Sequence, residues 1–235
     1  MKPYTYLIID VFCIIVPFIA SFYPKRAFYK KWKSFLLANI LVAVPFLVWD
    51  AIFTEIGVWG FNPDYLTGIY FFGLPVEEIL FFFCIPYACV FTHFALQYLI
   101  NKNPLERFSN WLTYFFMVVC IVFITVGFDK KYTFFTGLFT LLFLVFIRIR
   151  KVNISDALLT YFCIIPFFLL SNGILTGSFL EEPIVWYNNQ ENLAVRMFTI
   201  PVEDSIYGFL LIMLNIVLFD FFNKKLYKQS EAPGL

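Results

Sequence analysis

Seven apolar stretches, each about as long as a bilayer is thick, dominate this chain. A transmembrane α-helix needs roughly 20 consecutive apolar residues to cross the hydrocarbon core. Only Asp129, Lys130 and Lys131 separate the fourth stretch from the fifth, which predicts a tight antiparallel helix pair. The sequence therefore predicts an all-α fold, a polytopic transmembrane helix bundle of about seven spans. The expected spans are Tyr4–Tyr23, Ser34–Phe53, Leu74–Leu99, Trp111–Phe128, Tyr132–Ile149, Asp156–Leu175 and Ile200–Phe222.

Composition argues against a soluble fold. Of the 235 residues, 61% are apolar and 14% are charged, whereas about 25% are charged in ordinary soluble domains. A soluble monomer of this size could not bury so much apolar surface. A net charge of +1 gives no reason to expect nucleic acid as a partner. The five cysteines lie in apolar stretches without a Cys-x-x-Cys pair, so we expect unpaired thiols.

The distribution of basic residues predicts how the bundle is oriented. Thirteen of the 17 Lys and Arg residues fall in the loops and the tail on one side of a seven-span bundle. Cytoplasmic loops carry such an excess. We therefore expect a multi-pass cell-membrane protein with the N-terminus outside and the C-terminus in the cytoplasm. The first apolar run lacks a small-residue cleavage site and is long enough to span, so it is interpreted as a helix rather than a signal peptide.

The chain contains an internal repeat. Pro75-Val76-Glu77-Glu78 begins the third span, and Pro201-Val202-Glu203-Asp204 begins the seventh, 126 residues later. Other residues match in the same order, and their small length differences fall in loops. The matched pairs are Asp50 with Asn172, Glu55 with Glu182, Val58-Trp59 with Val185-Trp186, and Asn62 with Asn189.

This order predicts two parallel three-helix repeats joined by a linker helix. We expect the first repeat at residues 1–100, the linker helix at 101–131, and the second repeat with the tail at 132–235. Spans one to three correspond to spans five to seven, four spans later, so corresponding helices cross the membrane in the same direction. The halves should therefore be related by a pseudo-two-fold axis along the membrane normal. The carboxylates of both motifs then lie at one level of the membrane.

The acidic motifs have a structural and a functional interpretation. Proline suits the first turn of any helix, and acidic residues there complement the helix dipole. Ionisable groups within or beside membrane spans, however, are costly and usually functional. Asp50, about one turn inside the second span, and Asp10, roughly 9 Å into the first span at 1.5 Å per residue, add to the cluster. We therefore predict a functional carboxyl cluster.

The catalytic set expected from this cluster is Glu77, Glu78, Glu203, Asp204 and Asp50. Adjacent helix residues point about 100° apart, so one acid of each pair should face the shared cleft. We expect Glu77 and Glu203 to act directly, with Glu78 and Asp204 oriented by them or by Arg196. Replacing Glu77 or Glu203 by Gln is then expected to abolish product without affecting insertion.

Crowded carboxyl groups in an apolar site can hold one neutral acid beside one carboxylate. Such a pair can move a proton on and off an apolar substrate, and aromatic faces can stabilise a transient cation. Packing or interfacial anchoring is the alternative role for any single ring. His93, the single histidine, is interpreted as a helix-packing or membrane-interface residue. Substrate contacts are expected from Asn172, Trp59, Trp186, Phe81, Tyr207 and Asp10.

Several motifs are absent from the sequence. It contains no Gly-x-Gly-x-x-Gly dinucleotide fingerprint, no aspartate-rich diphosphate motif, and no lysine in the middle of the seventh span that could hold retinal. We therefore expect neither a cofactor nor a metal. A proton-coupled transporter is the main alternative, since carboxylates at a repeat interface also serve there. A membrane scaffold that partners other enzymes is another.

With its doubled Pro-Val-Glu-[Glu/Asp] motif, Asp50, Asn172 and seven spans, nearly the whole chain resembles the small membrane lycopene cyclases in their fused two-domain form. That resemblance implies cyclisation of the ψ-ends of lycopene to β-ionone rings, without redox change. It implies that a protonated Glu delivers a proton to C2 and that a carboxylate removes one from C6. An ε-ring or C50-carotenoid cyclase remains an alternative. Implied partners are lycopene and other linear carotenoids, membrane lipid and other carotenoid-pathway enzymes, and one composite site is implied.

Overall fold

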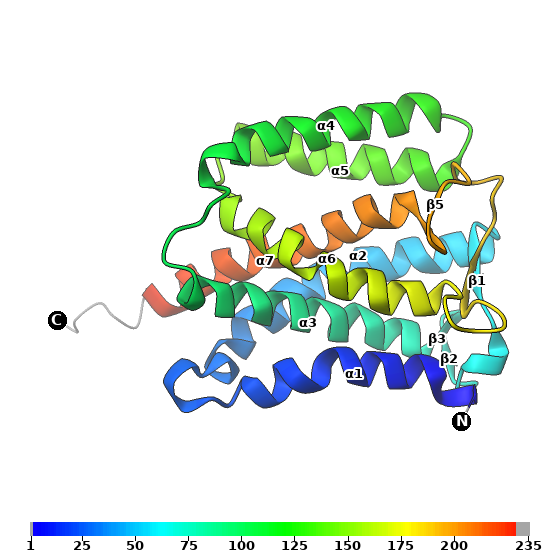
Figure 1. The fold of residues 1–235 in the computed structure, drawn as a ribbon, viewed down its shortest axis with the longest axis horizontal. Helices are drawn as coiled ribbons and strands as arrows, with labels where there is room; N and C mark the ends of the chain where they lie inside the picture. The colour runs from blue at the N-terminus through cyan, green and yellow to red at the C-terminus, as the bar shows by residue number, and fades with distance from the viewer. Residues whose placement is uncertain (1, 229–235) are drawn as a thin grey trace.

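The computed structural model describes residues 2–228 and contains seven long apolar helices in that range, as expected (Figure 1). Residue 1 and residues 229–235, which the expected repeats include, lie outside the described residues. The first helix begins and the seventh helix ends at opposite ends of the bundle, as an odd number of spans requires. The helices are α1 (Thr5–Ala20), α2 (Trp32–Glu55), α3 (Val76–Leu99), α4 (Ser109–Val126), α5 (Lys131–Ile149), α6 (Ser155–Leu175) and α7 (Val202–Lys228).

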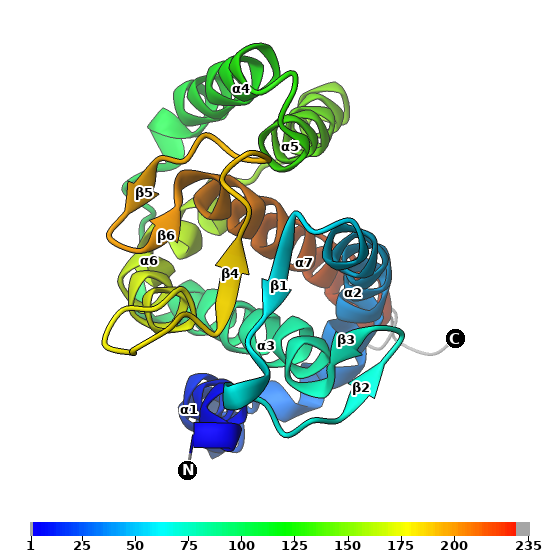
Figure 2. The same cartoon turned by 90° about the vertical axis from the view of Figure 1, so that its right-hand side faces the viewer.

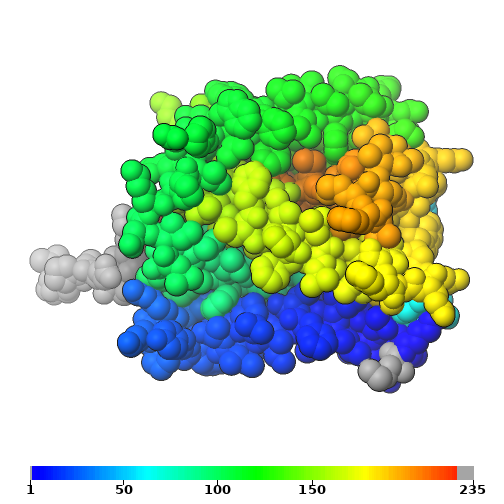
Figure 3. All heavy atoms as spheres, viewed as in Figure 1, coloured from blue at the N-terminus to red at the C-terminus, as the bar shows by residue number. Residues whose placement is uncertain are grey.

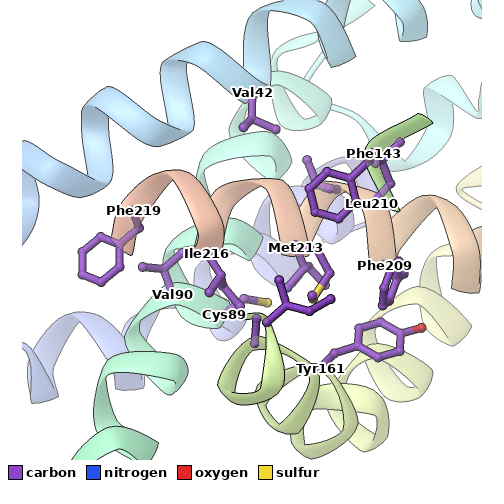
Figure 4. Close-up of a cluster of buried hydrophobic side chains, with 14 of the residues drawn as sticks. Val42, Cys89, Val90, Phe143, Tyr161, Phe209, Leu210, Met213, Ile216 and Phe219 are labelled. Atoms are coloured by element: carbon purple, nitrogen blue, oxygen red, sulfur yellow. The ribbon is translucent and has the colours of Figure 1, made fainter. Parts of the chain in front are cut away.

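Helix α7 lies at the centre of the bundle and packs against α2, α3, α5 and α6. Its residues Phe209, Met213, Ile216 and Phe219 are fully buried, and Figure 4 shows them among side chains from the surrounding helices. Lipid tails are as apolar as these side chains, so close packing rather than the hydrophobic effect holds the helices together. By contrast, most of α1 faces outward, and only Tyr6, Ile9 and Asp10 of that helix are buried.

The two halves pack with approximate two-fold symmetry. Helix α1 packs on α3 as α5 packs on α7, and α2 packs on α7 as α6 packs on α3. Helices α3 and α7 contact each other at the centre. Exchanging the two halves therefore converts the first contact of each pair into the second and leaves the α3–α7 contact unchanged, as the sequence repeat predicts.

Helix α4 stands outside this symmetry and packs along α5, the neighbour predicted from the short connection. The two helices approach closely at Gly137. A Cβ atom there would lie 2.9 Å from the carbonyl oxygen of Cys120 on α4. A small residue at this position therefore lets the two backbones meet.

Short strands cover one end of the bundle, called here the capped end (Figure 2). Strand β1 (Trp59–Phe61) pairs antiparallel with β4 (Val185–Tyr187), which places Trp59 opposite Tyr187 and Gly60 opposite Trp186. Exchange of the halves interconverts these two pairs, so the pseudo-two-fold axis passes through the β1–β4 ribbon. Two hairpins flank it, one in each half. They pair β2 (Tyr70–Phe71) with β3 (Leu74–Pro75), and β5 (Arg196–Met197) with β6 (Ile200–Pro201).

Candidate active site

A cavity of about 80 Å³ lies at the interface of the two halves. Its wall carries three carboxyl groups, those of Asp50, Glu78 and Asp204. Both halves contribute to it, as expected for one composite site. The rest of the wall is aromatic, aliphatic or amide: Tyr6, Trp59, Phe61, Phe81, Ile85, Tyr132, Phe168, Asn172, Leu175, Val185, Tyr187, Tyr207, Gly208, Leu211 and Ile212.

The carboxyl groups of the first repeat have few hydrogen bonds. The Tyr6 hydroxyl donates to Glu78 Oε2 at 2.5 Å, and the Trp59 indole N–H donates to Asp50 Oδ1 at 2.5 Å. The second oxygen of Asp50 is buried and has no hydrogen-bond partner among the described residues. Glu78 and Asp50 thus each accept one side-chain hydrogen bond here.

Asp204 of the second repeat is held by three donors. The Tyr132 hydroxyl donates to its Oδ1 at 2.5 Å, while the Asn172 amide and the Tyr187 hydroxyl donate to its Oδ2 at 2.7 and 3.0 Å. Burial raises the pKa of the Tyr187 phenol well above its usual value, and the adjacent Asp204 adds to this shift. Tyr187 therefore keeps its proton and remains a donor. These donors stabilise the charged form of the Asp204 side chain.

Glu77 and Glu203 do not line the cavity, so the prediction that they face the shared cleft is wrong. The backbone N–H of Thr67 donates to Glu77 Oε1 at 2.7 Å, and that of Leu193 donates to Glu203 Oε1 at 2.7 Å. Each donor lies ten residues before its acceptor. Both glutamates thus hold the loop that folds back over the start of their helix, and the 100° step along the helix turns Glu78 and Asp204 into the cavity.

Replacing Glu203 by Ala is expected to destabilise the second repeat. The Leu193 N–H and the Thr133 hydroxyl, which donates to Glu203 Oε1 at 2.7 Å, would both lose their buried acceptor. Each unsatisfied group costs about 1–3 kcal/mol. Thermal unfolding in detergent should show a lowered midpoint for Glu203→Ala. Glu203→Gln keeps an acceptor oxygen and should unfold closer to the unmodified protein; equal losses in both variants would contradict the loop-holding role.

Three other residues lie away from their predicted positions. Asp10 is buried on α1 but is not part of the cavity wall, and neither of its carboxyl oxygens has a hydrogen-bond partner among the described residues. Trp186 is 43% exposed, and its ring lies against Gly60, where a Cβ atom would overlap it. Arg196 donates to Asn189 at 2.6 Å. The two tyrosines and Asn172, rather than Arg196, therefore orient Asp204.

Aromatic rings surround the carboxyl groups on the side of the ribbon. Trp59 lies 5.1 Å from the Tyr132 ring and 6.2 Å from the Tyr207 ring, and Tyr132 stacks on Tyr187 at 5.8 Å. Trp59, Tyr207 and Phe81 line the cavity, and their contact with substrate stays a prediction. Tyr6, Tyr132 and Tyr187 were not predicted. The sequence contained evidence for Tyr6 and Tyr132, because they are 126 residues apart, the same spacing as the acidic motifs.

His93 lies on α3 and is buried, in agreement with its interpretation as a packing residue. Its Nδ1 lies 2.9 Å from the Thr160 hydroxyl of α6, and its Nε2 lies 3.3 Å from Asp220 of α7. It therefore joins three helices and does not belong to the cavity wall.

The fold and the cavity define a duplicated, multi-pass membrane protein with a carboxyl-lined apolar cavity between its halves. The family model described as lycopene cyclase matches the chain twice, over residues 3–96 and 129–222. The chain therefore belongs to the lycopene cyclase family, which makes it a cyclase of carotenoid biosynthesis with a carotenoid substrate. The double match confirms both the internal repeat and the family resemblance. No curated protein and no solved structure matches the chain.

Proposed function

We propose that the chain closes the ψ-ends of lycopene to β-rings, giving γ-carotene and then β-carotene, with Glu78 as the acid and Asp204 as the base. One observation carries this assignment: the first repeat holds poorly hydrogen-bonded carboxyl groups, and the second holds one carboxylate with three donors. The two halves of the cavity are therefore chemically different, although they descend from one repeat.

The first repeat supplies the proton. Asp10, Asp50 and Glu78 are all buried in this half, and three crowded carboxyl groups in a medium of low dielectric constant cannot all carry charge. Of the three, Glu78 and Asp50 line the cavity. Each accepts one hydrogen bond, Asp50 from Trp59 and Glu78 from Tyr6, but only Glu78 is the counterpart of Asp204 in the duplicated motif. Glu78 is therefore proposed to transfer its proton to C2 of the terminal alkene.

Ring closure follows from that protonation. The electrons of the C1=C2 double bond form the new C2–H bond and leave a cation at C1. The C5=C6 double bond then attacks C1 through C6, forming the C1–C6 bond and moving the cation to C5. Asp204 removes the C6 proton, and the released electron pair forms the C5=C6 bond of the β-ring. One proton enters and one leaves, so no oxidant or reductant is needed.

The aromatic groups stabilise the cations. Trp59, Tyr132 and Tyr207 line the cavity next to Asp50 and Asp204, and an aromatic face contributes about 0.5–2 kcal/mol to a nearby cation. Because Asp204 is fixed by Tyr132, Tyr187 and Asn172, its position relative to the ring is proposed to select the C6 proton. Removal of the C4 proton instead would give an ε-ring.

Expression in bacteria that accumulate lycopene tests this function directly. We expect the red pigment to turn orange and chromatography to show bicyclic β-carotene. An ε-ring product would reject the proposed proton selection while keeping the cyclase. Unchanged lycopene in cells whose membranes contain the protein would reject the function.

A further inference from the structure

We propose that the carotenoid enters the cavity laterally from the lipid between α1 and α6, and that the equivalent gap between α2 and α5 is sealed. This inference rests on the proposed cyclase function. The cavity, at about 80 Å³, is smaller than the roughly 150 Å³ cavity that accommodates benzene in another protein. The cavity is therefore too small for the end group of a carotenoid as it stands, so a neighbouring helix must move to enlarge it, and the remainder of the long molecule must extend through an opening between helices.

The internal repeat makes the two gaps comparable. Helix α1 corresponds to α5 with an offset of 126 residues, as Tyr6 corresponds to Tyr132, and α2 corresponds to α6 with an offset of 122, as Asp50 corresponds to Asn172. Exchange of the halves therefore maps the α1–α6 gap onto the α2–α5 gap. Any difference between the two gaps lies in their side chains.

Aromatic rings close the α2–α5 gap. The Trp49 ring of α2 lies 5.1 Å from the Phe139 ring of α5, and Phe53 of α2 lies 6.0 Å from Phe135 of α5. Trp49 also contacts Tyr207 of the cavity wall at 5.0 Å. These contacts extend from the lipid-facing side to the cavity, and they leave no path for a polyene chain.

No aromatic side chain occupies the four equivalent positions between α1 and α6. On α6, Ser171 takes the place of Trp49 and Leu175 that of Phe53; on α1, Cys13 takes the place of Phe139 and Ile9 that of Phe135. Ile9, Cys13 and Leu175 belong to one hydrophobic cluster, so this gap is closed by aliphatic side chains and a thiol rather than by interlocking rings. By the offsets of the repeat, Ser171 and Cys13 stand where Trp49 and Phe139 meet in the other gap. Figure 3 shows the atoms of α1 and α6 meeting along a seam on the outer face of the molecule.

The cavity and the packing of α1 favour the same side. Three wall residues, Phe168, Asn172 and Leu175, come from α6, whereas α2 supplies only Asp50 among the described residues. The helix backbones make few contacts across either gap, so the side chains decide which gap opens more readily. Moving α1 away from α6 opens the cluster that contains Ile9, Cys13 and Leu175, whereas opening the α2–α5 gap separates four aromatic rings.

Cross-linking across the seam tests the entry route. Ser171→Cys adds a thiol opposite the native Cys13, and a short bifunctional methanethiosulfonate joins the two reversibly. With lycopene supplied in lipid vesicles, we expect conversion to fall at least about ten-fold on cross-linking and to return with dithiothreitol, because opening of the gap gates turnover. The matched control is the double variant Trp49→Cys/Phe139→Cys in the α2–α5 gap. Its conversion rate after cross-linking should equal its own rate before cross-linking. Unmodified protein with the same reagent controls for reaction at its native thiols.

Two results overturn the lateral route. One is full conversion by Ser171→Cys protein whose α1–α6 cross-link mass spectrometry has verified. The other is a loss of conversion on cross-linking Trp49→Cys/Phe139→Cys that equals the loss on cross-linking the α1–α6 pair. Failure of the proposed function looks different, because the reduced, unmodified protein would then leave lycopene unchanged.

Discussion

Replacing Glu78 by Gln should lower lycopene conversion by at least about 100-fold, because general acid catalysis contributes roughly 10²–10⁴-fold to a rate. Gln has nearly the same shape and can still accept the Tyr6 hydrogen bond that Glu78 accepts at 2.5 Å. It cannot donate a proton to an alkene. Conversion in vesicles, normalised to inserted protein, is the measurement.

Glu77→Gln is the matched control for this loss, since it makes the same chemical change one residue earlier on α3. Glu77 binds the Thr67 N–H away from the cavity, and Gln retains an acceptor for that bond. We expect Glu77→Gln to stay within about ten-fold of the unmodified rate, with the residual loss reflecting a weaker hydrogen bond to an uncharged acceptor. If Glu77→Gln lost activity and Glu78→Gln kept it, the acid would be misassigned.

Replacing Asp204 by Asn should also reduce β-ring formation by at least about 100-fold, because the base that removes the C6 proton is lost. The acid step remains possible in this variant. Any turnover should therefore release its proton elsewhere and give a larger share of ε-rings. Chromatography of the pigments measures both the total and the ratio.

Tyr187→Phe separates the base from its positioning. This change removes one of three donors to Asp204, the longest at 3.0 Å, and leaves the carboxylate in place. We expect a smaller loss of rate than in Asp204→Asn, with a measurable ε-ring fraction. An Asp204→Asn protein that still makes only β-rings at the normal rate would contradict the role of Asp204.

Hydropathy and the repeat were enough to predict the seven spans, the pseudo-two-fold arrangement and the convergence of both acidic motifs on one cavity. All three depend on the lengths of the apolar stretches and on the order of the matched residues, both of which can be read from the sequence. The choice between Glu77 and Glu78 was wrong because a rotation of about 100° decides it. That rotation depends on how α3 packs against α1, α2, α6 and α7.

The partners of the acids were also not predictable from local sequence. Tyr6 bonds Glu78 and Tyr132 bonds Asp204 across 72 residues each. The β1–β4 ribbon joins segments from different halves, so neither strand has a neighbour along the chain to reveal it. Trp59 and Trp186 match in sequence, but the former lines the cavity and the latter lies against Gly60.

Helix α4 has a topological consequence. Each half crosses the membrane three times, so a half that starts at the capped end finishes at the opposite end. Two such halves can stand side by side in the same sense only if a further crossing carries the chain back. Helix α4 provides this additional crossing at the edge of the bundle, where it packs along α5. Because α4 joins the two repeats covalently, every molecule contains one copy of each, and the two different contributions to the cavity are always present in a one-to-one ratio.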